Sequence, residues 1–257
     1  MALSDITPVI IAHNAEATLP ETLESLSAFP MIVVYENGST DQTVAIAESF
    51  DNVKLVQGGF IGFGPTKNHA ATLAETDWVF SLDADEAPTG ELLRSLDTAD
   101  LSDPRVAYSV ERHNFFKGRR VRHSGWGSDW LIRLYNRGVH CFTEVQVHES
   151  ISLTDGSSVR RLRGPLNHIA VTEISQFLVK IDRYSELRRA EARRSYPAPV
   201  ILIKTFWAFF HTYVIRRGFL DGWRGLVIAV SDSNGTFYKY IKIHADRAME
   251  RESQRGD

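Results

Sequence analysis

The alternation of short apolar runs with helical patterns over the first hundred residues most restricts how this chain can fold. Four runs rich in β-branched and large apolar residues predict buried strands at 7–12, 31–35, 53–56 and 78–82. Between them, 18–29, 39–50 and 64–75 show helical patterns, each with a hydroxyl residue as N-cap candidate. Near-continuous apolar strands are typical of parallel sheets covered on both faces. We therefore predict an α/β fold with a mostly parallel sheet sandwiched by helices.

The rest of the chain has a different pattern. Residues 105–170 contain short strand-like runs between Gly- and Arg-rich loops, and the chain beyond about 172 looks helical, apolar and basic. We therefore expect two parts, a sheet-containing domain over 1–170 and a helical extension over 171–257.

Polar residues follow three of the four predicted strands. The first strand ends in "AHNAE", the second in "ENGSTD" and the fourth in "DADE". In open α/β sheets, ligands bind at the carboxyl ends of the strands. Asp83 and Asp85 are two positions apart, so on an extended backbone they project to the same side. Two such carboxylates suit Mg²⁺ or Mn²⁺, whereas one acidic strand end by itself is more often a turn or a helix cap.

Two further stretches suit a phosphorylated nucleotide. Glu36 precedes "NGSTD", which is either a turn and cap or a place where a carboxylate holds a base or ribose. "GGFIGFGPTKN" brings four glycines and Lys67 to a helix start. Such a stretch is either a flexible loop or a cradle for an anionic diphosphate, and it matches neither the Walker pattern nor GxGxxG.

In their order and spacing, "PVIIAHNAEATLPETLESL", "VVYENGSTDQT", "GFGPTKNHA" and "WVFSLDADE" resemble inverting family-2 glycosyltransferases with the GT-A fold. "RHSGWGSDWLIRLYNR", "VHE" and the later "RRGFLDGWRGLVIAV" resemble the bacterial lipopolysaccharide-core heptose β-1,4-glucosyltransferase branch. The resemblance runs from about residue 7 to 243. It implies metal-dependent transfer of a hexose, glucose from UDP-glucose, with inversion onto a lipopolysaccharide inner-core sugar.

The resemblance also implies roles for individual residues. The nucleoside would be held by Ala12, His13, Asn14 and Glu36, and Lys67 would lie near the diphosphate or uracil. Asp83, Ala84 and Asp85 would bind ribose and the metal, Mg²⁺ or Mn²⁺. Glu36 departs from the aspartate usual in relatives, and its extra methylene leaves the identity of the nucleoside open.

The acceptor hydroxyl must lose a proton as it attacks, and a carboxylate is the usual general base. Glu149 is the favoured candidate, because similar HE pairs recur at the acceptor side of this branch; Asp129 is the alternative. On the acceptor side, Trp126 either stacks on a sugar ring or packs within the protein. His148 either contacts the acceptor or has a purely structural role. Arg133 either binds substrate or pairs with one of these carboxylates.

The charge distribution suggests a partner for the second half of the chain. Residues 1–103 hold 3 Lys or Arg against 17 Asp or Glu, whereas residues 104–257 hold 26 against 15. A basic half suits an anionic membrane surface or a phosphorylated glycolipid acceptor, and no nucleic-acid motif accompanies it. One cysteine and no basic segment ahead of the first apolar run lead us to expect a cytoplasmic location, peripheral to the inner membrane.

The apolar stretch 198–215 sharpens this expectation. It is interrupted by Lys204 and His211 and followed by Arg216 and Arg217. A membrane-spanning helix needs about 20 mostly apolar residues, so a helix lying in the membrane interface suits this stretch better. A core helix or a homo-oligomer interface is the alternative.

Other functions remain open at this point. The acceptor is alternatively polyprenyl phosphate or another glycan, or the chain is a non-catalytic nucleotide-sugar-binding module on the membrane surface. A sugar-1-phosphate nucleotidyltransferase is disfavoured, because "AHNAEATLPE" lacks the Gly-rich, basic signature that such enzymes carry after the first strand.

Overall fold

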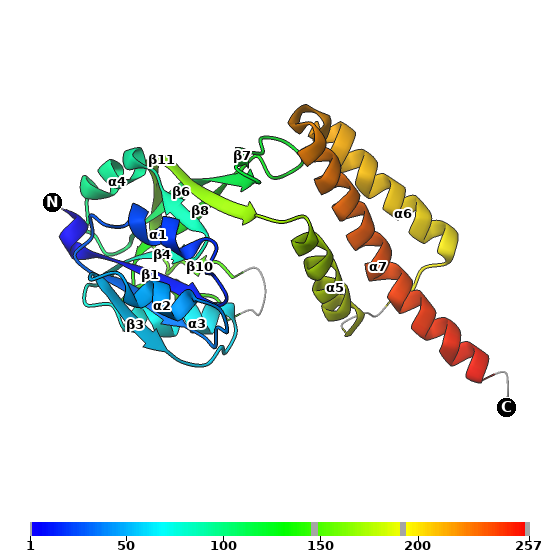
Figure 1. Cartoon of the computed structure of the whole chain (residues 1–257), viewed down its shortest axis with the longest axis horizontal. Helices are drawn as coiled ribbons and strands as arrows, with labels where there is room; N and C mark the ends of the chain where they lie inside the picture. The colour runs from blue at the N-terminus through cyan, green and yellow to red at the C-terminus, as the bar shows by residue number, and fades with distance from the viewer. Residues whose placement is uncertain (1, 145–148, 191–193, 255–257) are drawn as a thin grey trace. The chain divides into compact units, whose positions relative to one another are not determined.

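The computed structural model describes residues 2–144, 149–190 and 194–254 (Figure 1). The chain forms two compact units. The sheet unit comprises residues 1–113 and 129–169, and the helical unit comprises residues 114–128 and 170–257. The short segment 114–128 therefore belongs with the C-terminal helices, although it lies within the sequence of the sheet-containing part.

The four predicted strands form the parallel part of the sheet. They are β1 (Ile6–Ala12), β2 (Ile32–Glu36), β3 (Val53–Gln57) and β4 (Trp78–Asp83), in the spatial order β3-β2-β1-β4. All three neighbouring pairs are parallel. The strand order reverses between β1 and β4, because β2 and β3 lie on one side of β1 and β4 lies on the other.

The sheet continues past β4 in the order β8-β6-β11-β5. These strands are β5 (Glu86–Pro88), β6 (Val106–Phe116), β8 (Ser128–Asn136) and β11 (Ser158–Val171), with β7 (Arg119–Arg120) paired to β6. β8 is antiparallel to β4, and β5 is antiparallel to β11. A separate hairpin joins β9 (Cys141–Phe142) to β10 (Ile151–Ser152). The predicted α/β fold is confirmed, and the sheet adds an antiparallel part to its parallel one.

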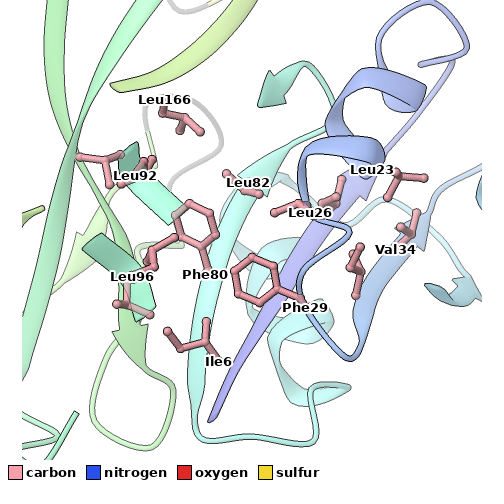
Figure 2. Close-up of a cluster of buried hydrophobic side chains, with 14 of the residues drawn as sticks. Ile6, Leu23, Leu26, Phe29, Val34, Phe80, Leu82, Leu92, Leu96 and Leu166 are labelled. Atoms are coloured by element: carbon pink, nitrogen blue, oxygen red, sulfur yellow. The ribbon is translucent and has the colours of Figure 1, made fainter. Parts of the chain in front are cut away.

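Helices cover both faces of the parallel strands. α1 (Leu19–Ser25), α2 (Thr43–Glu48) and α4 (Gly90–Asp97) contribute to one core cluster, and α3 (Phe63–Thr72) contributes to the other. Along β1, Ile10 belongs to the first cluster and Val9 to the second, as the period of two of a strand requires. Figure 2 shows Phe80 and Leu82 of β4 among leucines of α1 and α4. β1, β2 and β4 lack polar alternation because both of their faces are buried. The predicted burial is wrong for β3, which lies at the edge of the sheet and is only partly buried.

The predicted hydroxyl N-cap stands at its expected position in α1, and the predictions for α2 and α3 are wrong. Thr18 stands at the N-cap of α1 without a side-chain cap bond, and the N-caps of α2 and α3 are Gln42 and Gly62. The hydroxyls bind neighbouring loops instead. Ser39 Oγ accepts from the Asn14 amide at 2.9 Å, and Thr66 Oγ1 accepts from the Ile61 amide at 3.1 Å. Gly62 has a φ of 106°, which favours glycine at that position.

The helical unit contains α5 (Ser175–Ala190), α6 (Ala198–Phe210), the π-helical turn η2 (His211–Ile215), the 3₁₀ turn η3 (Gly218–Asp221) and α7 (Trp223–Ser253). α6 and α7 pack antiparallel. The Ser233 hydroxyl donates to the Thr205 carbonyl at 3.0 Å, and the Thr212 hydroxyl donates to Asp232 at 2.9 Å. The predicted helical C-terminal part is confirmed.

Candidate active site

The carboxyl ends of the parallel strands meet at one edge of the sheet. Ala12 pairs with Glu36, and Ile11 pairs with Asp83, so β1, β2 and β4 end within about one residue of each other. This edge includes the point between β1 and β4 where the strand order reverses. In open α/β sheets, the crevice at such a point is where ligands bind.

The residues after β1 are tied to the loop after β2. The Asn14 side-chain oxygen accepts from the Thr40 amide at 2.8 Å, and the Asn14 amide donates to Ser39 Oγ at 2.9 Å. His13 Nδ1 lies 3.1 Å from the Asn37 carbonyl, and the buried Ala12 accepts from the Asn37 amide at 3.1 Å. Three predicted nucleoside-binding residues thus form one connected rim with the β2 loop, and the His13 and Asn14 side chains are exposed on it.

Glu36 is only 3% exposed, and its carboxylate accepts the Ser39 amide. Its backbone carbonyl accepts from the Gly58 amide at 2.9 Å, which joins the β2 end to the β3 end. Glu36 therefore closes the turn 37–39 in this structure. Its role with the nucleoside remains a prediction.

Lys67, on α3, bridges two of the predicted site carboxylates. Its Nζ lies 2.7 Å from Asp83 Oδ1 and 2.9 Å from Glu149 Oε1, and the side chain is 3% exposed. Burial alone would lower the pKa of Lys67, but the carboxylates of Asp83 and Glu149 raise it above its ordinary value. The ammonium group therefore stays charged, and it links α3, the end of β4 and the segment before β10.

The segment that carries Glu149 is held against α3. Asn68 exchanges two hydrogen bonds with the Phe142 backbone of β9, at 2.9 and 2.7 Å. A Cβ at Gly64 would meet the Thr143 carbonyl oxygen at 1.9 Å, so only glycine allows this approach. These contacts set the distance between Lys67 and Glu149.

Asp83 is held by two cations. Its Oδ2 lies 2.9 Å from Arg133, whose guanidinium also bonds Glu86. Burial would raise the pKa of Asp83, but Lys67 and Arg133 hold it well below its usual range. Glu86 is fully buried and accepts the Asp83 amide at 3.0 Å. Arg133 thus pairs with Asp83 and Glu86 rather than with either candidate base, and its binding of substrate remains a prediction.

Asp85 has different surroundings. Its Oδ2 lies 3.3 Å from His168 Nε2, and its buried Oδ1 has no hydrogen-bond partner among the described residues. An unpartnered buried carboxylate oxygen is costly unless something binds it, and a hard cation fits such an oxygen. No cluster of three or more Asp, Glu, His or Cys that would hold a metal occurs in the described part of the chain. A cation here would take its other ligands from phosphate and water, as Mg²⁺ commonly does.

Asp129, the second candidate base, lies at the start of β8 and is held by Arg112. The guanidinium donates to both carboxylate oxygens, at 3.2 and 2.8 Å, and reaches Glu86 at 3.4 Å. Burial lowers the pKa of Arg112, but Asp129 and Glu86 raise it above its ordinary value. Glu149 and Asp129 therefore both stay candidates, each tied to a different cation.

Of the residues predicted for the acceptor side, Trp126 is among the described residues and His148 is not. Trp126 belongs to the helical unit, where its ring stacks on Phe177 at 5.7 Å between centroids and packs against a small core. This contact occupies one ring face, and sugar stacking by Trp126 remains a prediction. His148 lies outside the described residues. Ala84 follows β4, and its carbonyl accepts from the Thr22 hydroxyl at 3.1 Å.

The sequence analysis missed three residues of this site: Glu86, Arg112 and His168. Glu86 stands in "DADE", so its place after a strand was visible, but its complete burial was not. Arg112 lies on β6 and His168 on β11. These strands reach the site by pairing with strands distant in the sequence, which local sequence patterns do not reveal. His168 pairs with Glu86 in the register of β11 and β5.

The sequence matches a known protein family and several curated proteins. The family model described as Glycosyl transferase family 2 matches residues 7–154, more than half of the chain. A lipopolysaccharide core biosynthesis glycosyltransferase, LpsC of Rhizobium meliloti, is 28% identical over 260 residues, which cover 95% of this chain and 93% of LpsC. An uncharacterized glycosyltransferase of Rickettsia typhi, RT0209, is 24% identical over 255 residues, covering 94% and 87%.

Solved structures are more distant. S. aureus TarS 1-349 in complex with UDP is 17% identical, with a TM-score of 0.43 and coverage of 95% and 91%. Glucosyl-3-phosphoglycerate synthase from Mycobacterium tuberculosis, in complex with Mn²⁺, UDP and glucosyl-3-phosphoglycerate, is 22% identical, with a TM-score of 0.35 and 45% coverage of both chains. At these scores the family assignment rests on the sequence match.

Proposed function

This chain is a member of glycosyl transferase family 2, and on that premise we propose that it transfers glucose from UDP-glucose, with inversion, onto an inner-core sugar of lipopolysaccharide. The glycosyltransferase class follows from the family. The donor, the acceptor and the metal dependence are the proposal.

The difference between Asp83 and Asp85 carries the proposal. Both lie at the edge where the strand order reverses, but Asp83 is neutralised by Lys67 and Arg133, whereas Asp85 keeps an unpartnered oxygen. Asp85 would hold Mg²⁺ or Mn²⁺, and the bound cation would act as a Lewis acid toward the leaving diphosphate. Asp83, fixed by its two cations, would position a donor group such as the ribose.

The remaining donor contacts come from the rim and from α3. Glu36 and the 12–14 segment would contact the nucleoside. The first turn of α3 has no side-chain cap, so its free amides would face the negative diphosphate, with Lys67 one turn further along. Binding at this edge would bring the reacting carbon toward the two candidate bases.

Glu149 is the proposed general base, and Asp129 is the alternative. Lys67 orients Glu149 and at the same time contacts Asp83, which ties the base to the donor site. Asp129 is chelated by Arg112 through both oxygens, so it would have to leave that pair to accept a proton.

The acceptor assignment is supported by the match to LpsC, which extends over nearly the whole of both chains. The resemblance to the lipopolysaccharide-core β-glucosyltransferase branch supports glucose as the transferred sugar. Polyprenyl phosphate is the alternative acceptor, and an assay with both acceptors distinguishes them. We propose a location at the cytoplasmic face of the inner membrane, where such lipid-linked acceptors are found.

The first experiment is calorimetric titration of the chain with UDP-glucose, UDP-galactose and GDP-mannose, in Mn²⁺ and in EDTA. We expect binding of UDP-glucose that requires the metal and is lost in Asp85→Ala. Asp77→Asn is the matched control, because Asp77 stands just before β4, at the opposite end of the strand from Asp85, with a 79% exposed side chain. Absence of donor binding by the folded wild-type chain would overturn the proposal.

A second experiment separates the two bases. Glu149→Gln is expected to lower kcat by about 10²–10⁴-fold, the usual contribution of a general base, while donor binding persists. Asp129→Asn is expected to lower it much less. The reverse ranking would assign the base to Asp129. Full activity of both variants would exclude both residues.

A further inference from the structure

Exposed apolar side chains gather on one stretch of the helical unit. Of the 22 large apolar side chains that are exposed among the described residues, eleven lie between Leu202 and Val230. We call these eleven the apolar strip. Its most exposed members are Ile203 and Phe206 (68% each), Leu202 (60%), Trp207 (57%), Ile215 (56%) and Leu220 (55%). Exposed apolar side chains gathered in this number on a folded chain mark a binding surface.

Lys204 and Asp221, two charged residues within this stretch, have partners outside the strip. A third, Arg224, donates to the Phe116 and Lys117 carbonyls, and its guanidinium lies 4.5 Å from the ring centroid of Trp223, a strip member. The Lys204 ammonium, the one charge within α6, lies over the rings of Tyr196 and Tyr240, at 4.7 and 5.4 Å from their centroids. The carboxylate of Asp221, 8% exposed, accepts the backbone amides of Arg122 and His123 at 3.1 and 2.9 Å. The sequence interruption at Lys204 therefore does not interrupt the strip.

Two arginines stand at the turn after η2, in sequence between the strip residues up to Ile215 and those from Phe219 onward. Arg216 and Arg217 are both exposed there. The helical unit as a whole contains 19 Lys or Arg and 10 Asp or Glu, whereas the sheet unit contains 10 and 22. A surface that combines Trp, Phe and Leu side chains with arginine, on a net positive unit, is complementary to an anionic lipid surface. A second copy of this net positive unit offers no such charge complementarity.

We propose that the apolar strip inserts into the interfacial region of an anionic bilayer, with Arg216 and Arg217 at the phosphate level and α6 lying in the membrane plane. The inference is independent of the donor and the acceptor. It goes beyond the proposed reaction, because it names the surface and the lipid chemistry that hold the enzyme.

A membrane-spanning arrangement fits less well. Residues 198–215 pass the length and hydropathy test for a spanning helix, with a mean hydropathy of 1.4 and 11% of the stretch buried. Eighteen residues extend about 27 Å, less than the roughly 30 Å of the hydrocarbon core. α7 packs antiparallel along α6, so spanning would also draw Asp232 and its polar neighbours 231–236 into lipid. An in-plane α6 buries the strip and keeps this polar stretch out of the hydrocarbon.

The test is co-sedimentation of the full chain with vesicles of phosphatidylglycerol and phosphatidylcholine, compared with phosphatidylcholine alone. We expect binding to the anionic vesicles. The double variant Phe206→Ser/Trp207→Ser is expected to bind at least tenfold more weakly, since burial of each large apolar side chain gives about a tenfold gain or more. Val179→Ser is the matched control: Val179 lies on α5, is also 68% exposed and is outside the strip. Circular dichroism checks that each variant is folded.

A second double variant, Arg216→Gln/Arg217→Gln, tests the contribution of the two arginines to vesicle binding. Each basic residue near an anionic surface contributes about fivefold, so both together should weaken binding to anionic vesicles by roughly 30-fold and to neutral vesicles little. No vesicle binding by the folded wild-type chain would overturn the proposal. So would a lipid-independent dimer that the strip variants dissociate, which would assign the strip to a second copy. Binding that survives high salt and alkaline carbonate would overturn the in-plane placement in favour of a spanning helix.

Discussion

The two units of this protein depart from ordinary burial in opposite directions. The sheet unit buries charges, since Lys67, Glu86 and Arg133 are each 4% exposed or less. The helical unit exposes apolar groups along the strip. Folded chains seldom bury charges without partners or expose large contiguous apolar surfaces. In the two proposals above, each departure has its own ligand: a nucleotide sugar for the charged edge of the sheet unit and an anionic lipid surface for the strip.

The buried charges of the sheet unit form one continuous series. Carboxylate and cation alternate from Glu149 through Lys67, Asp83, Arg133, Glu86 and Arg112 to Asp129. Removal of the fully buried Glu86 deprives both Arg133 and Arg112 of a charge partner, which costs more than an intact pair contributes. The series therefore fixes the positions of the residues around Asp85.

The largest expected effect tests this interdependence. Glu86→Gln removes the fully buried carboxylate between Arg133 and Arg112 and is expected to lower the free energy of unfolding by about 3–5 kcal/mol. Urea unfolding at neutral pH measures the change. Glu75→Gln, at an exposed glutamate, should change stability by less than about 0.5 kcal/mol. If the two variants were equally stable, the charge series would contribute nothing to the fold.

The next effect separates Asp85 from Asp83. Asp85→Asn is expected to lower kcat/KM by about 10²–10³-fold with little change in stability, because its oxygen Oδ1 has no partner among the described residues. Asp83→Asn is expected to lower stability as well, because Lys67 and Arg133 then lose a charge partner. Steady-state kinetics and thermal unfolding of both variants make the distinction. Equal stability losses would contradict it.

A third test compares the core with the strip. Leu23→Ala, at a fully buried residue of the sheet unit, is expected to cost about 3 kcal/mol of unfolding free energy. Phe206→Ala, at a 68% exposed ring, is expected to cost less than about 0.5 kcal/mol. Denaturant unfolding of both variants without lipid checks this. A large loss for Phe206→Ala would place that ring inside a packed interface.

The part of the fold that follows from local pattern was predictable. All four parallel strands coincide with the predicted runs to within about one residue, because buried apolar runs identify themselves without distant partners. Because the strand 78–82 was predicted correctly, the position of "DADE" at the end of that strand was predicted correctly as well. The helix caps were only partly predictable: Thr18 stands at the N-cap of α1 without a side-chain bond, and the hydroxyls of Ser39 and Thr66 bind neighbouring loops. α4, which the sequence analysis did not predict, has a side-chain cap in which Thr89 Oγ1 accepts from the Leu92 amide.

The pairing of charges was not predictable, because it depends on contacts far apart in the sequence. Lys67 and Glu149 are 82 positions apart, and His168 reaches Asp85 only through the register of β11 with β5. The orientation of Lys204 shows the same limit in the helical unit. In the sequence, Lys204 interrupts an apolar stretch. In the structure, its ammonium group lies over the rings of Tyr196 and Tyr240 and therefore not within the strip.

The fourth prediction concerns acid stability. The pKa of Asp83 in the folded chain lies below its ordinary 3.8, so its stabilising contribution is complete above that value and is lost as the pH falls toward the folded pKa. The stability difference between wild type and Asp83→Asn should therefore be the same at about pH 7 and pH 5 and shrink at about pH 3. Urea unfolding at the three pH values measures it. A difference that grew in acid would reverse the assigned sign.

The smallest expected effect asks whether the stability of the helical unit is separate from its strip. Gly235 lies inside α7, where a Cβ would meet only Ile181 Cγ1, at an ordinary 3.9 Å. Gly235→Ala is therefore expected to raise stability by about 0.5–1 kcal/mol and to leave vesicle binding unchanged. Gly225→Ala is the contrast, because its Cβ would lie 1.8 Å from the Gly218 carbonyl oxygen. If Gly235→Ala stabilised the unit and also changed vesicle binding, helix packing and lipid contact would be coupled. An unchanged binding curve would show that the strip meets its ligand as a preformed surface, as the exposed ring of Phe206 predicts.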